Sequence, residues 1–144
     1  MITRVLKASA KEFKAMSSAD LLESIRKSEG RTIVTEIIAP LQPVLNKVTT
    51  AELAAAMGSD IMLLNMFDVQ NPFIYGLPQC EPDDTIRVLK ELIGRPIAIN
   101  LEPAVNPNEE NPDSAPWVEG RAATAENARK AVDMGVDLIL VTGN

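Results

Sequence analysis

Short apolar runs alternate with amphipathic segments along the chain after Gly30. Four runs are rich in aliphatic and β-branched residues and apolar on both faces, as buried parallel strands are; they span residues 31–37, 60–67, 95–102 and 137–142. Three segments between them have helical periodicity, with a Thr or Asp cap at the start and a Gly at the end, at residues 50–58, 82–94 and 124–135. This alternation predicts an α/β domain built on a parallel sheet.

The first 30 residues have a different pattern. Two helical segments begin with capping boxes, one at Ser9 and one at Ser17, and the second segment ends at Gly30. The sequence therefore predicts an N-terminal helical segment over residues 1–30, followed by a region of strands and helices over residues 31–144.

A weak internal repeat runs through the second region. EGRTIVTE before the first strand is similar to IGRPIAIN before the third, with Gly30 and Gly94 64 residues apart. MGSDIMLLN and MGVDLILVT are also similar, with Gly58 and Gly135 77 residues apart. Two βαβ units therefore look like copies, either because the chain arose by duplication or because such units converge on Gly-x-Asp-apolar junctions.

Four such strands with a twofold repeat predict half of a TIM (β/α)8 barrel, which has about 250 residues when complete. The alternative is a small doubly wound three-layer sandwich, in which the last strand is interior. The chain ends at Asn144, directly after an apolar run. Because an uncovered apolar edge strand is unusual in a natural domain, we expect a fragment, with the remainder of the barrel or a second copy in a homo-oligomer against its open edge.

The composition of the chain argues against some classes of binding partner. The formal net charge is −6 and the charges are spread along the chain, which argues against nucleic acid, since that needs clustered Lys and Arg. No apolar run approaches the roughly 20 residues of a membrane span, and the first residues lack the apolar core of a signal peptide. The single cysteine, Cys80, has no partner for an internal disulfide, so we expect a cytoplasmic protein.

The sequence contains no histidine, which limits the catalytic groups and metal ligands that it can supply. This absence excludes, within this chain, Ser–His and Cys–His nucleophile pairs, histidine bases and histidine-ligated zinc. Carboxylates, amides, Lys, Arg, hydroxyls or a hard cation bound by oxygens must serve instead. No glycine-rich nucleotide-binding motif is present, and no lysine stands at a strand end to form a Schiff base.

Each predicted strand begins apolar and ends in an acid or an amide. These side chains are Glu36 in the first strand, Asn65 and Asp68 at the second, Asn100 and Glu102 at the third, and Asn144 at the fourth. They are expected to converge, because parallel α/β folds bind ligands at the C-terminal strand ends. We predict Glu36 and Glu102 as catalytic acids or bases, or as ligands of Mg²⁺ or Mn²⁺, and the other four as substrate-binding residues. The alternative is that strand ends are polar because they meet solvent.

Loop lengths favour the same end of the sheet. The loops after the second and third strands, residues 68–82 and 103–123, are long, whereas the turns at the other end are tight. Arg121 in the longer loop is expected to bind an anionic substrate as part of a lid. An ordinary solvated loop fits equally well, and so does an oligomer interface built on Phe73, Tyr75 and Trp117.

The sequences MGVDLILVTGN and RPIAINLEP resemble those of bacterial (β/α)8 barrel proteins described as phosphoenolpyruvate phosphonomutase-like. The resemblance covers residues 31–144, the N-terminal half of such a barrel. It implies a Mg²⁺-dependent enzyme of lyase or isomerase type that acts on a small oxyanionic metabolite, a carboxylate or a phosphate. The family's Asp-rich, Gly-containing segment is absent after the third strand, where the sequence reads NLEPAVNPNEE, so Glu102 is the one chemical match to a metal-associated acid.

This fragment alone is expected to be inactive if the barrel needs its other half. The alternative to an enzyme is a non-catalytic metabolite-binding or oligomerisation module.

Overall fold

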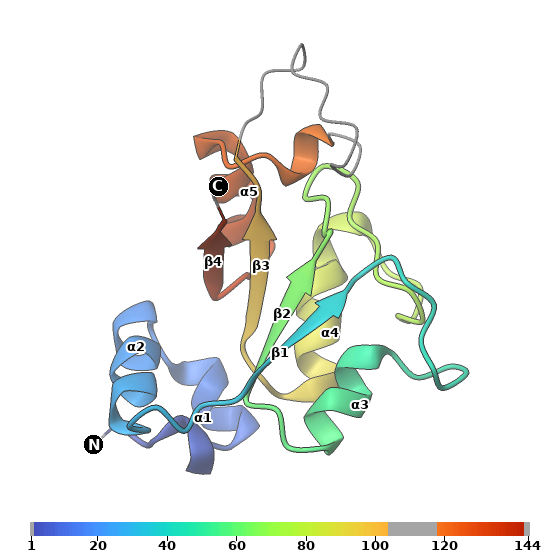
Figure 1. Ribbon diagram of the computed structural model, residues 1–144. Coiled ribbons are helices and arrows are strands. Elements are labelled where there is room, and N and C mark those ends of the chain that lie inside the picture. Colours follow the sequence, from blue (N-terminus) through green and yellow to red (C-terminus); the bar gives the residue numbers. More distant parts are fainter. Residues whose placement is uncertain (1, 104–117, 143–144) are drawn as a thin grey trace.

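A four-stranded parallel sheet lies at the centre of the molecule (Figure 1). The computed structural model describes residues 2–103 and 118–142. The strands lie in the order β1-β2-β3-β4, and every neighbouring pair is parallel. Their bounds are Val34–Ile38 for β1, Ile61–Asn65 for β2, Ile97–Leu101 for β3 and Leu138–Val141 for β4. Each strand overlaps the apolar run that predicted it.

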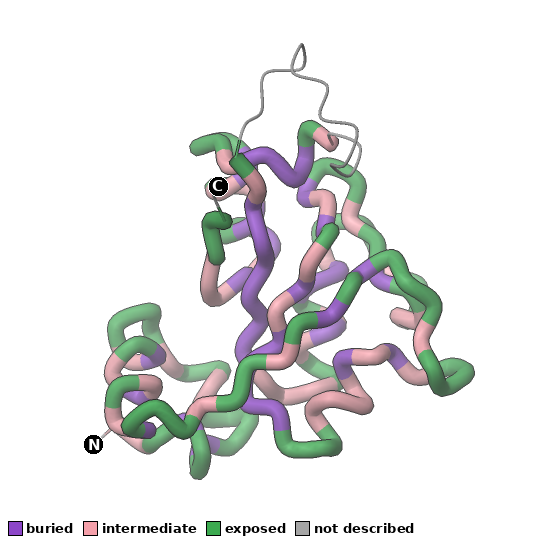
Figure 2. Tube along the Cα trace, viewed as in Figure 1, coloured by how far each residue is buried: buried purple, intermediate pink, exposed green. Residues whose placement is uncertain are grey.

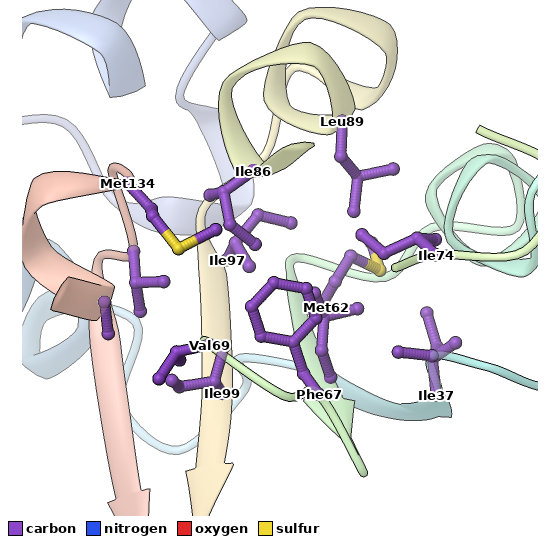
Figure 3. Packing of buried hydrophobic residues seen from close by; sticks show 14 of the residues in the cluster. Ile37, Met62, Phe67, Val69, Ile74, Ile86, Leu89, Ile97, Ile99 and Met134 are labelled. Carbon is purple, nitrogen blue, oxygen red and sulfur yellow. The ribbon is translucent and has the colours of Figure 1, made fainter. Parts of the chain in front are cut away.

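Three helices cover one face of this sheet and form the core with it. They are α3, Thr50–Ala56; α4, Thr85–Ile93; and α5, Ala125–Asp133, and each connects two consecutive strands. Leu89 of α4 and Met134, just after α5, pack in one buried cluster with Met62 and Ile99 of the sheet (Figure 3). Burying a side chain of this size stabilises the fold by roughly 1.5–3 kcal/mol, so this face holds the elements together.

The strand order excludes the doubly wound alternative. A doubly wound sheet reverses its strand order at a switch point and carries helices on both faces. Here the order is sequential, and the core contains residues from α3, α4 and α5 on the same side of the sheet. The fold is therefore α/β, with the strand order of half a TIM barrel.

Short helices precede the sheet, at the end where the strands begin (Figure 1). They are the 3₁₀ turn η1, Val5–Lys7; α1, Ala10–Ala15; and α2, Ser18–Lys27. Both predicted capping boxes are present, Ser9 with Glu12 and Ser17 with Asp20. Hydrogen bonds from the Ser9 backbone N–H, the Thr3 hydroxyl and the Ser9 hydroxyl, in decreasing order of effect, lower the pKa of Glu12 to about 2.

The later helices begin in two ways. Thr49 caps α3 and Thr124 caps α5, each accepting a backbone N–H with its side chain. The predicted Asp cap of α4 is wrong. Asp84 makes no capping hydrogen bond, because it ends the 3₁₀ turn η2, Pro82–Asp84, and pairs with Arg87 instead.

The repeated Gly-x-Asp junctions share one hydrogen-bonded structure. Asp60 accepts the Ile33 N–H with its carboxylate at 2.9 Å and donates its own N–H to the Ile33 carbonyl at 2.9 Å. Asp137 does the same with Ile97, at 2.8 Å and 2.9 Å. These residues occupy equivalent places in the repeat. Each aspartate joins the start of its own strand to the neighbouring strand, a structure that both duplication and convergent junction chemistry produce.

The other face of the sheet is open. Alternate residues of each strand lie on it, and three of its apolar side chains are exposed, with exposed fractions of 51% for Val34, 43% for Ile38 and 46% for Leu140, whereas Ile61 and Ala98 are buried. Figure 2 shows the contrast between β3, buried along its length, and the mostly exposed β1. In a barrel the corresponding face lines the interior, so this surface is the one that positions the candidate site.

Candidate functional site

Three of the predicted site residues project from the open face near the C-terminal ends of the strands. They are Glu36 of β1, Asn65 of β2 and Asn100 of β3. Side chains alternate between the two faces of a strand, and the residues adjacent to these three in their strands include members of the helix-covered core. The structure therefore places these three side chains on one face of the sheet, and the role of each stays a prediction.

Glu36 and Asn65 are joined across β1 and β2. Asn65 Nδ2 donates a hydrogen bond to Glu36 Oε1 at 2.6 Å, and Asn65 Oδ1 accepts the Met66 N–H at 2.8 Å. The amide is thus fixed at both ends and orients the carboxylate. Glu36 Oε2 makes no hydrogen bond with the described residues. Glu36 is exposed, so the burial that would favour a general base is not present in this arrangement.

Asn100 presents a donor on the same face. Its side chain is mostly buried, and its Oδ1 accepts a hydrogen bond from Thr142 Oγ1 at 3.2 Å. Its Nδ2 makes no hydrogen bond within the described part of the chain, so its N–H groups are available to a ligand. Thr142 is not among the predicted substrate-binding residues, and its position directly after the fourth strand is the one signal that pointed to it.

Glu102 and Arg121 pair with each other at the end of β3. Arg121 lies in the 3₁₀ turn η3, Glu119–Arg121, with only 4% of its side chain exposed, and its Nη2 is 3.5 Å from Glu102 Oε2. The backbones pair as well, since the Glu102 N–H donates to the Arg121 carbonyl at 2.8 Å. The structure thus places Arg121 inside the molecule, beside a carboxylate, and its role in binding an anionic substrate stays a prediction.

Asp68 lies in a turn after β2 and its carboxylate binds its own loop. Oδ1 accepts the N–H groups of Gln70 and Asn71 at 2.8 Å and 3.1 Å, and Oδ2 accepts Asn71 Nδ2 at 3.1 Å. This is the Asx-turn chemistry that shapes many loops. A Cβ at Gly120 would overlap Asp68 Oδ1, so η3 lies directly against this turn.

Asn127 is a polar residue that the sequence did not single out. It is buried in α5, where its Nδ2 donates to the carbonyls of Glu119 and Ala122 at 2.7 Å and 2.9 Å and its Oδ1 accepts Gln70 Nε2 at 3.4 Å. Asn127 therefore ties together the loops after β2 and β3. No motif or spacing marks it, because its partners come from distant segments.

Some predictions concern parts that the structure does not describe. Asn144, Trp117 and residues 104–117 of the predicted lid lie outside the described residues. Within residues 2–103 and 118–142, no group of three or more His, Cys, Asp or Glu side chains is placed to hold a metal ion. Over the same residues no helix has both the length and the hydrophobicity that a membrane span requires. The cytoplasmic location stays a prediction.

Comparison with known proteins identifies a family but no activity. No curated protein matches the chain. A solved structure of a Schiff base-forming fructose-1,6-bisphosphate aldolase is similar, with 15% identity and a TM-score of 0.40 over 91% of this chain and 45% of that chain. This chain therefore spans less than half of that aldolase chain. Nothing in these comparisons supports the phosphonomutase-like resemblance. The family model described as Domain of unknown function (DUF7916) matches residues 6–144, and the chain belongs to that family.

Proposed function

We propose that the C-terminal end of the open face binds a small polar metabolite, as part of the active site of a TIM-barrel enzyme. The observation that carries this proposal is the hydrogen bond of 2.6 Å from Asn65 Nδ2 to Glu36 Oε1. It holds a carboxylate in a defined orientation on the face that lines a barrel and leads to the strand ends, where barrel enzymes bind their substrates.

The surroundings of Glu36 favour a binding role over an incidental surface charge. Leu63 is its register neighbour on β2, and Val34 and Ile38 lie on the same face of β1. A charged group on an apolar face carries a desolvation cost once that face is covered, unless a partner satisfies it. Asn65 satisfies one carboxylate oxygen, and a ligand hydroxyl or ammonium group suits the other.

Asn100 supplies the complementary group. Because Thr142 occupies its Oδ1, Asn100 directs donor N–H groups toward a carbonyl, carboxylate or phosphate oxygen. Because β2 lies between β1 and β3, the backbones at Glu36 and Asn100 are about 10 Å apart or more. A metabolite that binds both residues therefore carries a hydroxyl at one end and an oxyanion at the other. This chemistry supports the expectation of a small carboxylate or phosphate substrate.

The proposal extends to the reaction itself, which we expect to be of lyase or isomerase type and assisted by a metal ion. A divalent cation between Glu36 and a substrate oxyanion would offset the repulsion between the two negative groups. The described residues do not by themselves complete such a centre, because Glu102 already pairs with Arg121 and no cluster of three acids is present among them. The proposed binding through Glu36 and Asn100 therefore does not depend on a metal.

Thermal unfolding in the presence of small hydroxycarboxylates and phosphate monoesters tests the proposal. Malate and glycerol 3-phosphate are suitable probes, because each carries polar groups at both ends, and each is measured with and without MgCl₂ or MnCl₂. A ligand that binds the folded chain raises its Tm. We expect at least one probe to do so, and Glu36→Gln and Asn100→Ala each to weaken its Kd by about tenfold or more, since each removes a hydrogen bond to a charged group.

The matched control is Glu126→Gln, which removes the same charge from an exposed position at the start of α5. It should bind the probe as the unmodified chain does. Binding that is unchanged in Glu36→Gln, or that falls equally in Glu126→Gln, would contradict the proposal. A Tm shift by MgCl₂ or MnCl₂ alone that disappears in Glu36→Gln would support the metal-assisted form.

A further inference from the structure

A cavity lies at the opposite end of the sheet from the candidate site. It has a volume of about 700 Å³ and is bounded by α1, the start of α2, the end of α4 and the segments that lead into β3 and β4. In Figure 1 α1 and α2 lie at the end of the sheet where the strands begin. Nothing in the proposed function uses this cavity.

The cavity is basic, although the chain as a whole has a net charge of −6. Its lining includes the cationic side chains of Lys11, Lys14, Arg87, Lys90 and Arg95. Two carboxylates, Glu91 and Asp137, also line it. Positive charge thus exceeds negative charge in a concave surface, an arrangement that attracts and retains an anion.

Two of these cations are available to a ligand. Lys11 and Lys14 lie on exposed positions of α1 and make no ion pair or hydrogen bond with the described residues. Lys90 differs, since its Nζ is 2.8 Å from Asp137 Oδ1. Arg95 also has a partner, because its guanidinium lies 5.8 Å from the centre of the Phe13 ring. The available charge is therefore concentrated on α1.

The same cavity contains apolar side chains. Phe13 and Met16 line it together with the charged groups, and both are partly exposed. Leu21 and Val136 also belong to the lining but are buried. A simple inorganic anion would use the lysines and leave this apolar surface in contact with water, whereas a neutral apolar molecule would leave the charge unused. The lining as a whole matches a ligand with both properties.

We propose that this cavity binds a small organic anion with an apolar body, either a carboxylate or a phosphate monoester. Its charged group binds Lys11 and Lys14, and its apolar body packs on Phe13 and Met16. Phenyl phosphate is a suitable probe, because it carries both features. Inorganic phosphate lacks the apolar body and phenol lacks the charge. Comparing phenyl phosphate with each of them therefore measures how much the apolar contact and the charge contribute to affinity.

Titration of the full chain with the three probes, followed by NMR chemical shifts of α1 and α4 amides, tests the proposal. We expect saturable binding of phenyl phosphate and roughly tenfold weaker binding of inorganic phosphate and of phenol. The double variant Lys11→Gln with Lys14→Gln should weaken phenyl phosphate roughly tenfold. Lys11→Arg with Lys14→Arg keeps both charges and should retain binding.

The control is Lys47→Gln with Lys130→Gln, which removes two charges from residues that do not line the cavity. It should leave the affinity for phenyl phosphate unchanged within about twofold. Glu36→Gln should also leave it unchanged, so that failure of this proposal and failure of the proposed function are distinguishable. The proposal is wrong if phenyl phosphate does not saturate, if inorganic phosphate binds equally well, or if the glutamine variants at Lys11 and Lys14 behave like the control.

Discussion

Single aspartates join neighbouring strands in this chain. The carboxylates of Asp60 and Asp137 each accept a backbone N–H at the point where a strand begins, and each aspartate returns its own N–H to the same partner. Backbone groups that leave water must find such partners, because an unpaired buried N–H is costly. The Gly-x-Asp spacing marked both aspartates in the sequence, whereas their partners, Ile33 and Ile97, became visible only in the folded chain.

Asp137→Ala should destabilise the chain by about 1–3 kcal/mol, because it leaves the buried N–H of Ile97 without its acceptor. Loss of the partly exposed pair with Lys90 adds little. Urea unfolding followed by circular dichroism measures the change. Asp133→Ala removes the same charge from an exposed position in α5 and should change stability by less than about 0.5 kcal/mol. Equal effects of the two substitutions would contradict the assigned role.

At the scale of elements, the N-terminal helices pack against the end of the sheet through a glycine. Gly94 ends α4 in the left-handed conformation, with φ at 61°. A Cβ at this position would lie 2.7 Å from Ala10 Cβ of α1. The glycine therefore ends α4 and also leaves room for α1 to pack closely against it. Its role as a helix stop could be predicted from the sequence. The approach of α1 could not, because Ala10 and Gly94 are 84 positions apart and no local pattern links them.

Substitution of two glycines separates these roles. Gly30 also has a positive φ, 75°, but nothing lies within 4 Å of its added Cβ. Gly30→Ala should therefore cost roughly 1–2 kcal/mol from backbone strain alone. Gly94→Ala should cost at least about 1 kcal/mol more, because α1 must also shift. Thermal and urea unfolding of both variants checks this, and equal losses of stability would show that α1 does not pack closely on Gly94.

At the scale of the whole molecule, the two faces of the sheet differ in how far they are covered. One face is buried under α3, α4 and α5, and the other carries apolar side chains that remain partly exposed. Exposed apolar patches on a sheet with open edges favour association with further polypeptide. We therefore retain the proposal that a second copy, or further barrel strands, covers this face, and that the candidate site becomes enclosed only then.

Self-association through the open face is testable with one substitution on β4. Leu140 lies on that face with 46% of its surface exposed. Leu140→Lys should weaken any self-association by about tenfold or more, since it places a charge in an apolar contact. Val132→Lys makes the same change at a residue of α5 that is 62% exposed and should not weaken it. Sedimentation across a range of concentrations checks both, and a monomer at every concentration would refute the expected association.

The sequence by itself determined the elements and the class of fold, because helix caps, glycine stops and apolar runs act over a few residues. The capping boxes at Ser9 and Ser17 and the four strands follow from such local patterns. Only the tertiary structure decided which polar groups meet. Glu36 binds Asn65 although 29 residues separate them, whereas Glu102 is paired with Arg121. Contacts of this kind depend on strand register and on helix placement, and these arise from packing of the whole core rather than from any one segment.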